Sequence, residues 1–182
     1  MAHRAVFMDR DGTIMTDYGH LADPDQVRFL PGVLEGLERL QAAGFKLIVI
    51  TSQSGVEQGL LTREEVEAVH ERIEERAAEE GVFFAGLYYC THLKDSGSFF
   101  RKPQPGMLYQ AALEHEIHLG ESFMLGNYAT DIGAGRRAGC KGTVFTGEIV
   151  PESLKKHGET PNCTAPDFLK AVEYVLKEGG EE

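Results

Sequence analysis

The 182-residue chain is 42% hydrophobic and carries a formal net charge of −11. This length favours one domain, spanning residues 1–182, that buries a single core. The negative charge and the lack of any Lys/Arg cluster larger than a pair argue against a nucleic-acid partner or a polybasic membrane face.

The apolar stretches are all too short for a membrane span, which needs roughly 18 to 20 residues, and the N-terminal apolar run is too short for a signal-peptide core. We therefore expect a cytoplasmic protein with no membrane partner, working as a monomer. The three cysteines, Cys90, Cys140 and Cys163, are odd in number and widely spaced, which indicates free thiols and not a disulfide framework.

Short apolar runs alternate with amphipathic stretches along the whole chain, a pattern typical of a parallel α/β sheet. The expected strands are residues 5–8, 46–50, 86–90, 122–126 and 141–145. The expected helices are residues 33–44, 62–81, 105–117, a fourth starting near Thr130, and 166–180. The second helix should begin with a capping box formed by Thr62 and Glu65. We expect the helical histidines to be solvated: His70, His115 and His118.

Polar residues follow four of these strands. In an open parallel sheet, ligands bind outside the carboxyl ends of the strands. Asp9, Thr51 and Asn127 lie just past strands, and Lys102 lies beyond the loop after a fourth strand. The sequence therefore predicts that four separate segments meet in one crevice.

The first of these segments reads "VFMDRDGTI" and contains two carboxylates two residues apart. One interpretation is an Asx-rich turn that leaves a strand. The other is catalytic: Asp9 is a covalent nucleophile that forms an aspartyl-phosphate, and Asp11 protonates the leaving oxygen and then activates water. The other three segments favour the catalytic interpretation.

An anionic nucleophile and a phosphoryl group roughly 4 Å apart repel by about 4 kcal/mol per charge pair at an effective dielectric of 20. Lys102 supplies an ammonium that offsets this repulsion. Asp9, with oxygen ligands from the end of the fourth strand, suits Mg²⁺, a hard cation that prefers oxygen. Thr51 and Ser52 offer hydroxyl and backbone donors for phosphoryl oxygens.

Together, "DRDGT", "ITSQSG", "RKPQPGM" and "GNYATD" resemble the four ordered motifs of the haloacid dehalogenase (HAD) superfamily of phosphohydrolases. The resemblance covers residues 5 to about 147. It implies a Rossmann-like α/β fold with a central parallel sheet, helices on both faces and a minimal cap. The implied reaction is Mg²⁺-dependent hydrolysis of a phosphate monoester by a phosphatase.

A narrower resemblance is carried by "DYGHLADPDQVRFLPGV", "TSQSGVEQGLLT", "GLYYCTH" and "RKPQPGML". These are similar to the D-glycero-D-manno-heptose-1,7-bisphosphate 7-phosphatase family, with the N-terminal histidinol-phosphate phosphatases as an alternative. The first implies removal of the C7 phosphate from a heptose bisphosphate in lipopolysaccharide or surface-glycan precursor metabolism.

The resemblance also implies roles for individual residues. The nucleophile and the general acid and base would be Asp9 and Asp11. The substrate contacts would be Thr51, Ser52, Gln53, Arg101 and Lys102, with Lys102 also neutralising the nucleophile. The Mg²⁺ ligands would be the Asp9 carboxylate, the Asp11 carbonyl and residue 127.

Related chains often carry a structural zinc loop with a Cys, a His two residues later and a Cys-x-Cys pair before the Arg-Lys. Cys90 and His92 match the first half, but Ser98 and Phe100 occupy the second. Two ligands do not complete a tetrahedral site, so we expect no structural zinc.

The fourth motif normally begins Gly-Asp, whereas this chain has Gly126-Asn127. An amide oxygen still ligates Mg²⁺ but removes one negative charge, so metal affinity should fall. Three interpretations stay open: a natural, weaker ligand in a working enzyme, with Asp131 helping through a water; a chain that binds a sugar phosphate without turnover; and an introduced substitution.

Overall fold

A computed structural model describes residues 2–150 and 152–180. Its centre is a parallel sheet of six strands in the order β3-β2-β1-β4-β5-β6. The strands are β1 (Ala5–Met8), β2 (Lys46–Ser52), β3 (Gly86–Cys90), β4 (Phe123–Gly126), β5 (Gly142–Thr146) and β6 (Cys163–Ala165). The predicted parallel α/β class is confirmed.

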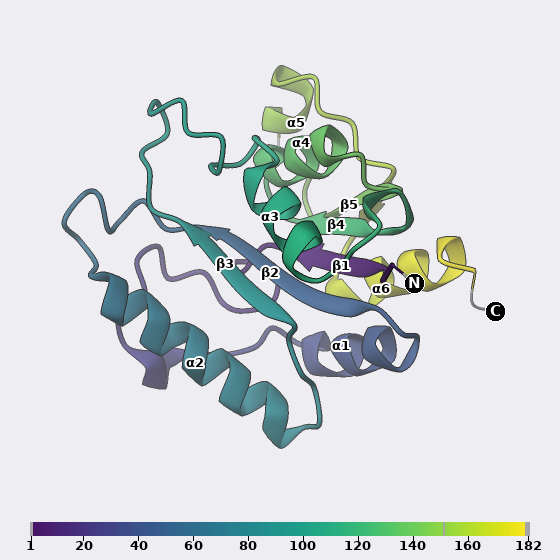
Figure 1. The fold of residues 1–182 in the computed structure, drawn as a ribbon, viewed down its shortest axis with the longest axis horizontal. Helices are drawn as coiled ribbons and strands as arrows, with labels where there is room; N and C mark the ends of the chain where they lie inside the picture. Colours follow the sequence, from purple (N-terminus) through teal and green to yellow (C-terminus); the bar gives the residue numbers. More distant parts are fainter. Residues whose placement is uncertain (1, 151, 181–182) are drawn as a thin grey trace.

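Six α-helices and two short 3-10 helices accompany the strands in the described part of the chain, and the last of them follows the final strand (Figure 1). The α-helices are α1 (Val33–Ala42), α2 (Arg63–Glu79), α3 (Gly106–Glu114), α4 (Ala129–Ala138), α5 (Glu152–Lys156) and α6 (Phe168–Glu178). The 3-10 helices are η1 (Pro24–Gln26) and η2 (Leu119–Glu121).

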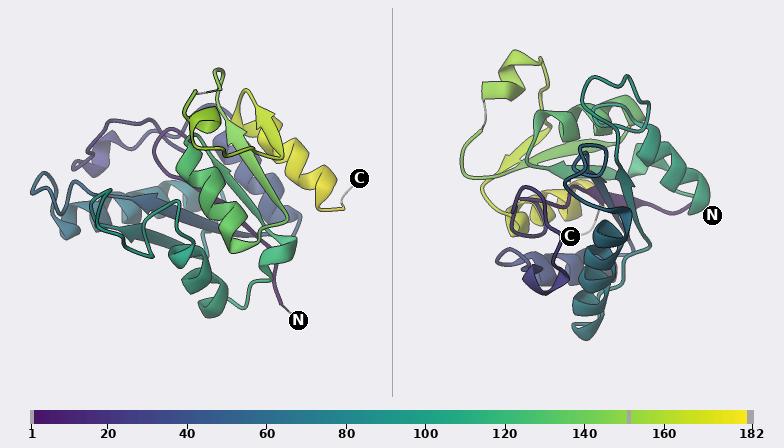
Figure 2. Two further views of the ribbon diagram at one scale, coloured as in Figure 1. Left: turned by 90° about the horizontal axis from the view of Figure 1, so that it is seen from above. Right: turned by 90° about the vertical axis from the view of Figure 1, so that its left-hand side faces the viewer.

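The inner strands β1, β2, β4 and β5 bury both of their faces, as parallel strands with helices on each side do, whereas the edge strands β3 and β6 are only partly buried. Val6 and Met8 of β1 pack with residues of α1, α2 and α6, whereas Ala5 and Phe7 pack with residues of α3 and α4. Figures 1 and 2 show the two helical layers on opposite sides of the sheet. Helices on both faces were predicted and are confirmed.

Strand β1 lies at the centre of the sheet, between β2 and β4. The chain runs outward from β1 through β2 to β3 on one side, and then crosses to β4, β5 and β6 on the other. The carboxyl ends of β1 and β4 therefore flank the point where the direction of winding changes, which is where open α/β sheets bind ligands.

The observed elements differ from the predicted ones mainly at their ends. β2 continues through Thr51 and Ser52, β4 begins one residue later, and β5 runs over Gly142–Thr146. The third helix ends at Glu114 and not at residue 117, because Glu116 has a φ of 53° and its carbonyl accepts from the His3 amide. Both β6 and α5 were missed.

The capping box at the start of α2 is confirmed. Glu65 N donates to Thr62 Oγ1 at 3.1 Å, and Thr62 N donates to Glu65 Oε2 at 2.7 Å. The solvated position predicted for His70 is wrong. This side chain is 6% exposed, and its ring meets the Tyr89 ring edge to face at 5.6 Å, because α2 packs this part of its surface beside β3.

No helix in residues 2–150 and 152–180 is both long and apolar enough to cross a membrane.

Candidate active site

Asp9 follows the last residue of β1 and is 5% exposed. Its amide donates to the carbonyl of Leu125 in β4 at 3.0 Å, which places it beside Gly126 and Asn127. The turn that follows Asp9 needs a glycine at position 12, where φ is +77° and a Cβ would lie 2.3 Å from the side chain of Asn127. The first and fourth predicted segments therefore meet directly.

Lys102 reaches Asp9 from the segment before α3. Its ammonium donates to Asp9 Oδ1 at 2.7 Å, to Asp131 Oδ1 at 2.7 Å and to the Ile50 carbonyl at 3.0 Å. Lys102 is 6% exposed, so these three acceptors replace water around a buried cation. The structure thus brings Asp9 and Lys102 together, as the sequence predicted.

Asp131 was missed as part of this cluster. The sequence suggested only a supporting role for it, through a water. In the structure it is 1% exposed, forms an ion pair with Lys102, and accepts from the Tyr128 amide at the start of α4 through Oδ2 at 2.9 Å. Gly126 permits this position, since a Cβ there would lie 2.3 Å from Asp131 atoms.

The buried cluster shifts the pKa values of its members. Burial first, and then the negative charge of Asp131, raise the pKa of Asp9 to about 6, against the lowering effect of Lys102. Burial lowers the pKa of Lys102, but the carboxylates of Asp131 and Asp9 outweigh it, and the net shift is upward. Lys102 is therefore a permanent cation, and Asp9 is mostly ionised at neutral pH.

Asp11 is held by two side chains. The Arg10 guanidinium donates to it through Nε and Nη2 at 3.0–3.2 Å, and Gln53 Nε2 donates to Oδ2 at 2.9 Å. Burial raises the pKa of Asp11, and the charge of Arg10 opposes this. A raised carboxyl pKa suits a group that both gives and takes a proton near neutral pH.

Of the remaining predicted substrate residues, Gln53 contacts Asp11 directly and Thr51 is joined to it through Gln53. Thr51 is buried and its Oγ1 accepts from Gln53 Nε2 at 2.8 Å, and Ser52 is half-buried beside it at the end of β2. Gln53 is 3% exposed, and its Nε2 donates hydrogen bonds to both Asp11 and Thr51. Arg101 Nη1 donates to the His92 carbonyl at 2.8 Å. Their roles in substrate binding stay predictions.

Asn127 lies against the other two predicted metal ligands. In the amide orientation that satisfies the surrounding groups, Nδ2 donates to Asp9 Oδ2, to the Asp11 carbonyl and to Thr13 Oγ1, each at 3.2 Å. If the side-chain amide rotates by half a turn, its oxygen takes the place of Nδ2 and faces the Asp9 carboxylate and the Asp11 carbonyl. One carboxylate, one carbonyl and one amide oxygen then form a hard oxygen donor set that fits Mg²⁺.

Residues 2–150 and 152–180 hold no group of three His, Cys, Asp or Glu side chains arranged to bind a metal ion. The candidate Mg²⁺ site is of another kind, because it uses one carboxylate together with a backbone carbonyl and an amide. Cys90 Sγ and His92 Nδ1 are 3.3 Å apart, with Cys90 buried at the end of β3 and His92 exposed.

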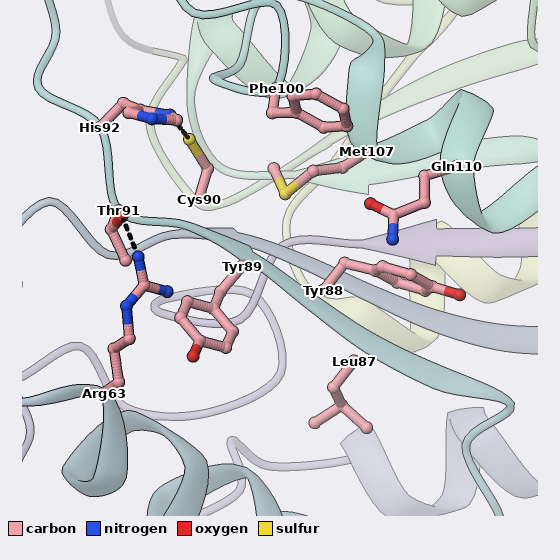
Figure 3. Close-up of a pocket in the computed structure, with 10 residues that line it drawn as sticks. All are labelled: Arg63, Leu87, Tyr88, Tyr89, Cys90, Thr91, His92, Phe100, Met107 and Gln110. Carbon is pink, nitrogen blue, oxygen red and sulfur yellow. Dashed lines mark hydrogen bonds between the residues drawn. The ribbon is translucent and has the colours of Figure 1, made fainter.

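A cavity of about 380 Å³ lies along β3, which is an edge strand of the sheet. Figure 3 shows Arg63, Tyr88 and Met107 around it, with Cys90 and His92 near one end. Asp9, Asp11 and Lys102 are not among its lining residues. The cavity and the carboxylate–lysine cluster are therefore separate places on the molecule.

The comparisons with known proteins agree with this geometry. Residues 99–171 match a family model described as HAD-hydrolase-like. A D-glycero-β-D-manno-heptose-1,7-bisphosphate 7-phosphatase from Pasteurella multocida is 37% identical, covering 93% of this chain and 96% of the relative. The Helicobacter pylori protein of the same name is 36% identical, covering 95% and 98%.

Among solved structures, one is a D,D-heptose 1,7-bisphosphate phosphatase from B. bronchiseptica, complexed with magnesium and phosphate. It superposes with a TM-score of 0.85 at 27% identity and covers 96% of this chain and 99% of the other. The predicted fold, family and phosphatase class are confirmed. The chain belongs to the heptose-1,7-bisphosphate 7-phosphatase family of HAD hydrolases, which are phosphoric monoester hydrolases.

Proposed function

We propose that this chain hydrolyses the C7 phosphate of D-glycero-D-manno-heptose 1,7-bisphosphate through an aspartyl-phosphate on Asp9. The observation that carries the proposal is the buried contact of Lys102 Nζ with Asp9 Oδ1, at 2.7 Å, in a site that also holds Asp11. The substrate is supported by the names of the relatives, which match over nearly the whole chain.

In the first step, a carboxylate oxygen of Asp9 attacks phosphorus, and the bond from phosphorus to the sugar oxygen breaks. The carboxyl group of Asp11 gives its proton to that oxygen. In the second step, water attacks the phosphorus, Asp11 takes a proton from the water, and the bond to Asp9 breaks. The net reaction consumes one water and releases the sugar hydroxyl and inorganic phosphate.

The other residues supply charge and position. Lys102 keeps Asp9 oriented and offsets part of the negative charge that gathers when a phosphate enters. Thr51 and Ser52 offer donors for phosphoryl oxygens at the end of β2. Mg²⁺ would be held by an Asp9 oxygen, the Asp11 carbonyl and the Asn127 amide oxygen, and when bound it would supply positive charge that offsets the repulsion between the carboxylate and the phosphoryl group.

Phosphate release tests the proposal. It would be measured with heptose 1,7-bisphosphate and with histidinol phosphate, with and without Mg²⁺, for the natural chain and for Asn127→Asp. We expect faster release from the heptose substrate and a requirement for Mg²⁺. Asp9→Asn should abolish turnover, whereas Asp95→Asn, on an exposed loop, should not change it. Turnover by Asp9→Asn would refute the covalent mechanism.

Asn127 favours a second candidate, a sugar-phosphate-binding domain without turnover, because its amide hydrogen-bonds to the oxygens that would hold the metal. Phosphate release by the natural chain would exclude this candidate. Release only after Asn127→Asp would support it, and no release by either form from any phosphomonoester would refute the enzymatic proposal. The monomeric state and the cytoplasmic address stay predictions.

A further inference from the structure

Arg10 lies between the two aspartates in sequence, and it is the largest fully buried side chain among the described residues, with 0% exposure. A guanidinium is always charged, so burying it is costly unless a carboxylate lies against it. That carboxylate is Asp11, whose Oδ1 is 3.0 Å from Arg10 Nη2. Nη1 is buried too and has no hydrogen-bond partner in the described part of the chain.

The position of this ion pair argues against a purely structural role. A salt bridge between segments that are distant in sequence ties those segments together. Arg10 and Asp11 are adjacent, so their contact joins no separate elements. Its effect falls on the Asp11 side chain itself, on the direction of its carboxylate and on its charge.

The Asp11 carboxylate is held at both of its oxygens. Arg10 Nε donates to Oδ1 at 3.1 Å and to Oδ2 at 3.2 Å, while Gln53 Nε2 donates to Oδ2 at 2.9 Å. Gln53 is fixed in turn by Thr51, whose Oγ1 it also contacts at 2.8 Å. Only 16% of the Asp11 side chain is exposed, which leaves one side open toward solvent.

We propose that Arg10 is a positioning residue for Asp11. It fixes the carboxylate in one orientation through a guanidinium fork, with Gln53 holding the second oxygen. The inference rests on the proposed function, in which Asp11 first gives a proton and then takes one. Each reacting carboxylate then has its own buried cation, Lys102 for Asp9 and Arg10 for Asp11.

The choice of leaving group distinguishes a misplaced Asp11 from general damage to the site. An alkoxide leaving group needs the proton of Asp11, whereas p-nitrophenolate leaves without one. Both substrates need Asp11 for the second step, the attack of water. A variant with a misplaced Asp11 should therefore still transfer phosphate from p-nitrophenyl phosphate to Asp9, and then stall.

Arg10→Met and Arg10→Lys would be made in the natural chain and in Asn127→Asp, and mixed rapidly with p-nitrophenyl phosphate. We expect a burst of p-nitrophenolate close to one per folded site, at a rate within about threefold of the parent, followed by slow turnover. Turnover of heptose bisphosphate should fall by about tenfold or more. The fall should be smaller than the full contribution of general acid–base catalysis, which is about 10²–10⁴-fold. Arg10→Lys should lie between Met and the parent, because an ammonium cannot form the fork.

Arg72→Met is a matched control, since it removes an ion-paired arginine that contacts Asp25 and not the site. It should leave both substrates unchanged. Gln53→Leu removes one hydrogen bond to Asp11 and should show the same pattern as Arg10→Met with smaller losses. This variant replaces Arg10→Met in the test if Arg10→Met does not fold. If Arg10→Met lost as much in the burst rate as in heptose turnover, or lost nothing in either, the inference would be overturned. Activity of the parent would still uphold the proposed function in that case. A parent inactive in both backgrounds would overturn both.

Discussion

Asn127→Asp adds one negative charge to the candidate metal site. With every carboxyl group ionised, the natural site contains three negative charges, on Asp9, Asp11 and Asp131, and the two cations Lys102 and Arg10, for a net charge of −1. The substitution makes it −2. It also removes the amide donor that lies 3.2 Å from Asp9 Oδ2 and from the Asp11 carbonyl.

The size of the effect on metal affinity follows from these distances. At about 4 Å and an effective dielectric of 20, one added charge is worth at most about 8 kcal/mol against a divalent cation. Even a sixth of this upper bound, about 1.4 kcal/mol, changes the affinity about tenfold. We expect Asn127→Asp to bind Mg²⁺ at least about tenfold more tightly than the natural chain.

The metal-free protein should respond in the opposite direction. The introduced carboxylate, when ionised, cannot donate, and it would face Asp9 Oδ2 across about the same gap that the amide now bridges. We expect the variant to be about 1–3 kcal/mol less stable than the natural chain without metal, the usual penalty of leaving buried polar groups unpaired. Bound Mg²⁺ stabilises the folded state in proportion to RT ln(1 + [Mg²⁺]/Kd), so the order of stability should reverse as Mg²⁺ is added.

Titration calorimetry with Mg²⁺ and thermal unfolding across a Mg²⁺ series would measure both effects. Asn162→Asp is the matched control, because Asn162 accepts hydrogen bonds from Thr143, away from the site. It should leave the Mg²⁺ affinity unchanged. Equal Kd values for Asn127→Asp and the natural chain, within about threefold, together with parallel Tm curves, would refute this account of the site.

Three further substitutions test other contacts. Asp131→Asn leaves Lys102 with the carboxylate of Asp9 as its one remaining anionic partner. It should lower the free energy of urea unfolding by about 1–3 kcal/mol, which is less than the cost of removing the only partner of a buried charge. Gly126→Ala places a Cβ 2.3 Å from Asp131 and should cost about 1–3 kcal/mol in the same measurement; an unchanged midpoint would contradict this packing. Burial, aided by the charge of Arg10, lowers the pKa of His70 to about 3, so between pH 6.5 and 3 the unfolded chain binds a proton that the folded chain does not. Stability should therefore fall with acidification below pH 6.5, by up to about 1.4 kcal/mol per pH unit from this residue, and His70→Gln should flatten the slope in a pH series of urea unfolding curves.

β1 and β3 match the predicted residues, but hydrophobicity could not place the end of β2. The apolar run stops at Ile50, whereas Thr51 and Ser52 still pair with Tyr89 and Cys90 of β3. Backbone pairing does not depend on apolar side chains, so a strand that continues into a binding site is longer than its apolar run.

The short C-terminal elements were missed for a related reason. β6 is the three-residue stretch Cys163–Ala165, and it is set by pairing with Val144, Phe145 and Thr146 of β5. A stretch of this length carries no periodicity that distinguishes a strand from a loop. Its structure depends on a neighbour that is distant in sequence.

In the candidate site, the sequence located groups but could not assign their partners. Asp9 and Lys102 follow separate segments of the fold, and parallel pairing predicted that they meet. Nothing local indicates that Asp131, in the first turn of a helix, turns inward to the same ammonium. The available clue was that a buried lysine ammonium needs more than one acceptor. A lysine placed beside one buried aspartate and a phosphate site therefore calls for a second acceptor.

Arg10 shows the same limit and also bears on why residue 127 is neutral. An arginine next to two aspartates has the appearance of a surface turn. The turn instead folds back, with the amides of Thr13, Ile14 and Met15 near the Arg10 carbonyl, and the guanidinium is buried. With two cations already matched to Asp9 and Asp11, and Asp131 sharing the first, a carboxylate at 127 would have no cation of its own until metal bound. An amide avoids that repulsion in the metal-free protein and weakens metal binding for the same reason.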